Sequence, residues 1–246
     1  MTQRFMTEDG QPSDVEKALK AAAAQAESDP SIVEVVFVVP TLKDLPSTTL
    51  AGAIGEGPSK KLAKGEPVTF HNLPARATSV SKFVRPRQSA LVVAVYADRK
   101  TMNLLDEAVG AHTVIAVPHV LSALDAWKNA WSPQVLGQPT APAPAQTPVK
   151  DGVVTKALED LTSSINLSNA ALGVQDRARA EEVLRSLRCL DHHQEPAANL
   201  RAWAVGRGWK PKAADELQKM AMKFFSAKTK PKLAAGVIER ARQRWL

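Results

Sequence analysis

The sequence predicts an α/β domain over residues 1–131 followed by an all-helical domain over residues 153–246. Strand-sized apolar runs alternate with helix-length segments in the first part, whereas helical apolar spacing continues through the second. The region between them, residues 132–152, contains five of the 17 prolines. Because proline lacks an amide hydrogen and fixes φ, we expect this region to be a semi-extended linker that lets the domains move independently.

The α/β domain begins with residues 1–12, which we expect to be irregular. Residues 13–16 read Ser-Asp-Val-Glu, which matches a capping box and predicts a helix that ends near Asp29. Residues 32–39 then form a run rich in valine in which Glu34 is the one charged residue. An apolar run without alternation is typical of a strand buried on both faces.

Three more strands and two helices complete the predicted α/β domain. The strands are expected at residues 67–71, 90–97 and 113–117, and the helices at residues 99–109 and 120–131. Strands that alternate with helices at these lengths are typical of parallel crossovers. The domain is therefore predicted to be a small Rossmann-like unit with a mostly parallel sheet of about four strands.

The all-helical domain is predicted to contain five helices, at residues 155–165, 176–190, 196–207, 211–226 and 233–245. The third and fourth helices, with the short turn between them, have the outline of a helix-turn-helix module. Because any two helices joined by a turn share this outline, a plain corner of a helical bundle is the alternative.

The net charge of +7 is distributed unevenly along the chain. Residues 1–150 carry 15 Lys or Arg and 14 Asp or Glu, whereas residues 151–246 carry 17 and 11. The last 42 residues alone hold 11 basic and 3 acidic side chains. Such asymmetry favours an acidic partner, DNA or RNA above all, and a basic surface that only aids solubility is the alternative.

Two regions supply the candidate nucleic-acid-binding residues. The first is the connection over residues 72–88, which contains no acid and is expected to be a long loop with little regular structure. Its arginines would contact phosphate or, as the alternative, pair with acids of the same domain. The second is the outward face of the fourth helix with the segment after it, where Asp215 and Glu216 oppose phosphate contact. The candidates are Arg76, Lys82, Arg85 and Arg87 in the first region, and Lys212, Lys219, Lys223, Lys228, Lys230, Lys232, Arg240 and Arg244 in the second.

The sequence shows no recognisable catalytic or metal-binding pattern. The glycine cluster at residues 52–61 departs from a phosphate loop, because Pro58 follows Gly57 and has no amide hydrogen to offer. We expect a surface turn there instead. His192 and His193 are too close together in the chain for a metal cage. No metal and no cofactor are therefore expected.

A ligand site at the sheet is the second possibility that the sequence offers. If the sheet is parallel, ligands bind at its carboxyl edge, where the strands end. The polar residues that follow the predicted strands are Asp44, His71, Asp98 and His119. They match no known triad, and Asp98 is equally suited to cap the next helix. A binding edge is therefore favoured over a working active site.

The chain is expected to lie in the cytoplasm and to have no membrane partner. No apolar run approaches the roughly 20 residues of a membrane helix, and residues 1–14 lack the apolar core of a signal peptide. The single cysteine, Cys189, excludes an internal disulfide and fits a reducing compartment. Its place in a helical apolar pattern predicts a buried thiol.

These observations favour a non-enzymatic, nucleic-acid-associated accessory protein. Its basic helical domain would contact DNA or RNA, and its α/β domain would bind a partner protein or a ligand. One alternative is an enzyme that acts on a nucleotide or phosphorylated substrate at the carboxyl edge of the sheet. Another is a protein–protein adaptor that binds no nucleic acid.

Overall fold

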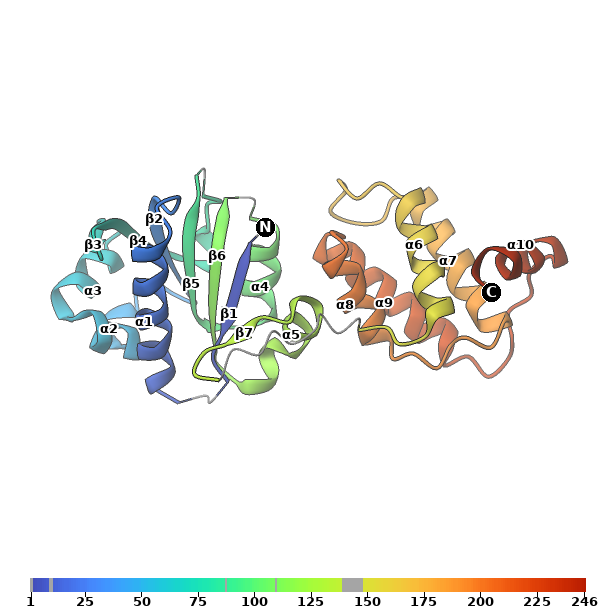
Figure 1. Cartoon of the computed structure of the whole chain (residues 1–246), viewed down its shortest axis with the longest axis horizontal. Coiled ribbons are helices and arrows are strands. Elements are labelled where there is room, and N and C mark those ends of the chain that lie inside the picture. The colour runs from blue at the N-terminus through green and yellow to red at the C-terminus, as the bar shows by residue number, and fades with distance from the viewer. Residues whose placement is uncertain (1, 9–10, 87, 109, 139–147) are drawn as a thin grey trace. The chain divides into compact units, whose positions relative to one another are not determined.

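The computed structural model describes residues 2–8, 11–86, 88–108, 110–138 and 148–246. The chain divides into two compact units. The α/β unit contains the described residues up to Lys128 together with residues 132–138, and the helical unit contains residues 129–131 and 148–246. The predicted fold class, a mostly parallel α/β sheet plus an all-α part, is confirmed (Figure 1).

The α/β unit is built on a seven-stranded sheet with the strand order β3-β4-β2-β5-β6-β1-β7. Within the described residues, every pairing of strands is parallel except that of β3 with β4. The strands are β1 (Gln3–Met6), β2 (Glu34–Val39), β3 (Val68–Phe70), β4 (Leu73–Ser79), β5 (Ala90–Ala97), β6 (Ala111–Pro118) and β7 (Gln134–Val135).

The central strands are buried on both faces. Val35 and Phe37 of β2 belong to one apolar cluster with residues of the first helix, and Val36 and Val38, which alternate with them, are buried on the other face. This double burial is why β2 and β5 are continuous apolar runs in the sequence. The helices of this unit are α1 (Ser13–Ser28), α2 (Thr49–Ile54), α3 (Glu56–Ala63), α4 (Arg99–Asp106) and α5 (Asp125–Trp131), with 3-10 turns η1 (Leu45–Ser47), η2 (Val80–Lys82) and η3 (Leu121–Leu124).

Three strands lie where the sequence predicted none. The segment expected to be irregular at the start of the chain contains β1, which pairs with β6 and β7. The connection over residues 72–88 is not a long loop, because most of its first half is β4, which pairs with β2 and β3. Strand β7 lies inside the predicted linker over residues 132–152, and residues 139–147 of that linker lie outside the described residues. These strands have weak patterns of their own and are held by hydrogen bonds to their neighbours.

Two local predictions about helices were wrong. The glycine cluster at residues 52–61 is helical: it forms the end of α2 and most of α3, and the two helices join at Gly55, whose φ is +93°. Pro58 lies in the first turn of α3, where a missing amide hydrogen costs nothing. Helix α1 begins after Pro12 without a side-chain cap, so Ser13 does not form the predicted capping box.

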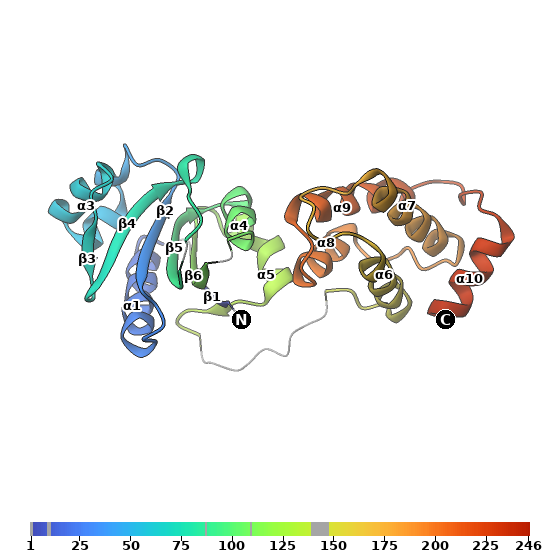
Figure 2. The same ribbon diagram turned by 90° about the horizontal axis from the view of Figure 1, so that it is seen from above.

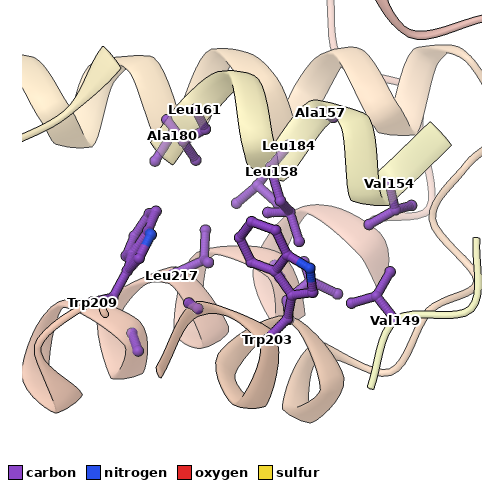
Figure 3. Packing of buried hydrophobic residues seen from close by; sticks show 14 of the residues in the cluster. Val149, Val154, Ala157, Leu158, Leu161, Ala180, Leu184, Trp203, Trp209 and Leu217 are labelled. Carbon is purple, nitrogen blue, oxygen red and sulfur yellow. The ribbon is translucent and has the colours of Figure 1, made fainter. Parts of the chain in front are cut away.

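The helical unit contains α6 (Gly152–Ser164), α7 (Val174–Cys189), α8 (Ala197–Gly206), α9 (Pro211–Phe225) and α10 (Ala235–Trp245). All five helices were predicted from apolar spacing. Their apolar faces meet around Trp203 and Trp209, which lie among Leu158, Leu184 and Leu217 (Figure 3). The indole of Trp209 also donates a hydrogen bond to Thr162 at 2.9 Å, so its polar atom is satisfied inside the core.

We expect Gly110→Ala to destabilise the α/β unit. A Cβ at Gly110 would stand 2.1 Å from the backbone oxygen of Pro86, so the chain must move to admit it. Overpacking of this kind costs about 1–3 kcal/mol. The matched control is Gly52→Ala in α2, where a Cβ meets nothing within 4 Å and a gain of about 0.5–1 kcal/mol is expected. Urea unfolding of both variants measures the difference, and equal midpoints would contradict the packing at Gly110.

Candidate functional site

Two of the four candidate nucleic-acid-binding residues of the α/β unit are paired with acids. The guanidinium of Arg76, on β4, lies 3.1 Å from Glu34, and that of Arg85 lies 3.1 Å from Glu107. Lys82 is exposed at the end of η2. Arg87 lies outside the described residues. The segment itself contains no acid, but the fold brings acids from other parts of the domain next to it. Arg76 and Arg85 therefore follow the alternative in which arginines of this segment pair with acids of the same domain.

The four candidate ligand residues of the sheet do not come together. Asp44, Asp98 and His119 follow β2, β5 and β6, which are parallel neighbours, so all three lie at the carboxyl edge. His71 lies at the opposite edge, because β3 runs antiparallel to β4 and the turn between them faces the amino ends of the other strands. There the ring of His71 lies 3.0 Å from Glu27 at the end of α1. His71 was predicted to lie at the carboxyl edge with the other three residues, and this placement was wrong.

The three residues that share the carboxyl edge have local partners. Asp44 accepts a hydrogen bond from the hydroxyl of Thr41 at 2.6 Å. Asp98 caps α4 and accepts from the backbone N–H of Thr101 at 2.8 Å and from its hydroxyl at 2.7 Å. Burial opposes the charge of Asp98, but these hydrogen bonds outweigh it and lower its pKa below the ordinary value. The capping role of Asp98 therefore accounts for its place in the fold.

Tyr96 is a further residue of the carboxyl edge that the sequence did not indicate. It lies in β5 at an irregularity in the pairing with β6, and its φ is +59°, which is uncommon for a residue with a side chain. Its hydroxyl lies 2.5 Å from the hydroxyl of Thr49 and accepts a hydrogen bond from the N–H of Thr49 at 3.1 Å. The ring of His119 meets that of Tyr96 edge to face, with centroids 6.1 Å apart. Tyr96 thus ties the start of α2 to the end of the central strand.

Helix α9 presents a lysine face. Lys212, Lys219 and Lys223 are exposed and stand seven and four residues apart, so they share one side of the helix. The two acids of the helix are held by arginines of neighbouring helices. Asp215 lies 2.6 Å from Arg201 of α8, and Glu216 lies 2.9 Å from Arg177 of α7. The acids that opposed phosphate contact in the sequence are neutralised in the structure.

The other basic candidates of the helical unit fall into two groups. Lys230 lies 2.7 Å from Asp191, and Arg244 lies 3.0 Å from Asp160, so both charges are paired. The remaining candidates are exposed and form no ion pair within the part of the chain that the structure describes; besides the lysine face of α9, they are Lys228, Lys232 and Arg240. The cations available to a partner therefore lie on α9, in the segment after it and on α10.

The histidine pair after α7 belongs to the framework of the helical unit. His192 lies 2.7 Å from Asp151, which caps α6, and His193 contacts the guanidinium of Arg188. Burial and the charge of Arg188 lower the pKa of His193. Within the described residues there is no group of three His, Cys, Asp or Glu side chains placed to hold a metal ion. The thiol of Cys189 is half-buried and donates to the carbonyl of Pro231 at 3.3 Å.

The comparisons with known proteins bear on the helical unit. Residues 150–246 match a family model described as a domain of unknown function (DUF1889). Neither the comparison with curated proteins nor that with solved structures gave a match. None of the described helices has the length and apolar content needed to span a bilayer.

We expect Asp98→Asn to be less stable than the natural protein at neutral pH, with a difference that narrows in acid. The folded-state pKa of Asp98 is lowered, so its ionised form stabilises the fold above about pH 4 and this contribution is lost as the pH falls through the folded pKa. Asparagine keeps an oxygen for the cap but has no charge. Urea unfolding of both proteins at pH 7 and pH 3 measures the difference, and a gap that does not narrow between the two pH values would contradict this role.

Proposed function

We propose that this chain is a non-enzymatic accessory protein whose helical unit binds DNA or RNA through the lysine face of α9. In this proposal the α/β unit binds a partner protein or a ligand, and the protein works in the cytoplasm. The free, half-buried thiol of Cys189 is compatible with a reducing compartment.

The observation that carries the proposal is the charge on α9. Lys212, Lys219 and Lys223 extend over about 16 Å of the helix axis at 1.5 Å per residue, so they could reach successive phosphates of one strand. Glu216 lies among them on the same side, but its charge is offset by Arg177. A nucleic acid would therefore meet a surface with a net positive charge along the whole helix.

The neighbouring helix supports the same interpretation. Helices α8 and α9 lie side by side, joined by the turn over residues 207–210 (Figure 2). Buried Arg201 of α8 holds Asp215 of α9 at 2.6 Å, which fixes the rotation of α9 and leaves its lysines outward. Helix-turn-helix modules use their second helix for contact with nucleic acid in this way.

The triple variant Lys212→Gln, Lys219→Gln, Lys223→Gln is expected to lose most of the salt dependence of binding. Each phosphate contact contributes about 0.9 to the slope of log K against log salt on duplex DNA, so three contacts contribute about 3. Fluorescence anisotropy with a labelled duplex and a labelled single-stranded RNA, at several salt concentrations, measures the slope.

The matched control carries the same loss of charge in the α/β unit. Lys43, Lys61 and Lys64 are exposed and form no ion pair within the described residues, so their replacement by glutamine is expected to leave the slope unchanged. Equal slopes for the two triple variants would reject α9 as the interface. Absence of any salt-dependent binding by the natural protein would reject the proposed function.

Two single substitutions at the Arg177–Glu216 ion pair are expected to change nucleic-acid binding in opposite directions. Arg177→Gln leaves Glu216 unpaired among the lysines and is expected to weaken nucleic-acid binding. Glu216→Gln removes the negative charge and is expected to strengthen it. Each change is expected to be a few-fold, since one exposed charge is worth about 0.2–1 kcal/mol. The same anisotropy titration measures both, and changes of the same sign would contradict an anionic partner at this face.

A further inference from the structure

A cavity of about 320 Å³ lies within the helical unit, between α6, α7 and α10. Its lining repeats at helical spacing: Arg179, Glu182 and Ser186 come from one side of α7, and Arg240 and Arg244 from one side of α10. Residues at the end of α6 complete the lining. The volume lies at the lower end of the range for small-ligand sites, about 300–1,000 Å³.

The cavity combines apolar lining residues with a charged rim. Val183 and Val237 on its lining are half-buried, whereas Leu161, Ala241 and Trp245 are buried. The arginines stand at its margin, where Arg240 is exposed and the side chain of Arg244 is 68% exposed. This lining suits a ligand that has an apolar part and a charged group at one end.

Most charges on the rim already have partners. Asp160 accepts hydrogen bonds from Arg244 at 3.0 Å and from the indole of Trp245 at 3.4 Å, which neutralises its charge. Arg179 donates to the carbonyl of Ser164 and so caps the end of α6. Two groups on the rim form no ion pair within the described residues, Arg240 and Glu182.

We propose that this cavity binds a nucleoside monophosphate, with its phosphate on Arg240 and its base against the apolar part of the lining. Guanidinium groups bind phosphate through paired, charge-assisted hydrogen bonds, and a base packs on apolar and aromatic side chains. The phosphate can belong to a free nucleotide or to the phosphorylated end of a strand. The second source rests on the proposed function, whereas the first does not.

The test is a titration of the whole chain with adenosine 5′-monophosphate, measured by NMR or calorimetry. The monophosphate is expected to bind at least about tenfold more tightly than adenosine, because the nucleoside has no anionic group for Arg240. Arg240→Gln is expected to weaken binding of the monophosphate about tenfold. The matched control is Arg242→Gln. Arg242 lies two residues further along α10 and outside the cavity lining, so this substitution is expected to leave the affinity for the monophosphate unchanged.

The substitution Glu182→Gln tests whether the ligand is an anion or a cation. Removal of this unpaired carboxylate is expected to tighten binding of the monophosphate a few-fold. Weaker binding by this variant would overturn the proposal in favour of a cationic ligand. Equal affinity for the monophosphate and adenosine, or equal effects of Arg240→Gln and Arg242→Gln, would also overturn it.

A pair of 12-nucleotide RNA strands separates the two sources of phosphate. Tighter binding of the 5′-phosphorylated strand than of the 5′-hydroxyl strand, lost in Arg240→Gln, assigns the cavity to a strand end. Equal binding of the two strands, with monophosphate binding intact, assigns it to a free nucleotide. Failure of the nucleic-acid proposal is distinguishable, since the 5′-hydroxyl strand would then not bind at all.

Discussion

The burial of β2, β5 and β6 on both faces is the constraint on which the α/β unit depends. Buried backbone groups need hydrogen-bond partners, so these strands must pair on both sides, and their outward side chains must be covered by helices. Because these strands are parallel, the connection that follows each of them starts at the same edge of the sheet. That edge therefore collects Asp44, Asp98, Tyr96 and His119, while the one antiparallel hairpin carries His71 away from it.

In the helical unit, ion pairs between helices decide which charges remain available. The side chain of Arg201 is 4% exposed and pairs with Asp215, and Arg177 pairs with Glu216, so the charges of both acids of α9 are offset while its lysines stay available. Asp160 holds Arg244 at the edge of a cavity and leaves Arg240 without an ion pair in the described structure. Net charge alone, +6 over residues 151–246, would not distinguish these cations from one another.

Sequence patterns predicted the elements that are long and strongly apolar and missed those that depend on neighbours. The five helices of the helical unit and the valine-rich β2 and β5 were predicted because each buries a regular apolar face. Strand β4 contains Pro74 and Arg76 and is held by pairing with β2, so its own residues gave little signal. The positive φ of Tyr96 has no sequence signature. The lysines on the outward side of α9 were predicted, but the ion pairs that offset the charges of Asp215 and Glu216 depend on the packing of α7 and α8 against α9.

The two outermost strands of the sheet, β3 and β7, are three and two residues long. An open edge normally offers a row of free amide and carbonyl groups on which another polypeptide can add a strand, and short edge strands are one way in which proteins prevent this. Each of these two strands therefore offers few backbone groups of its own to an added strand. A protein that docks on either strand would gain few backbone hydrogen bonds, so recognition there would depend mainly on side chains.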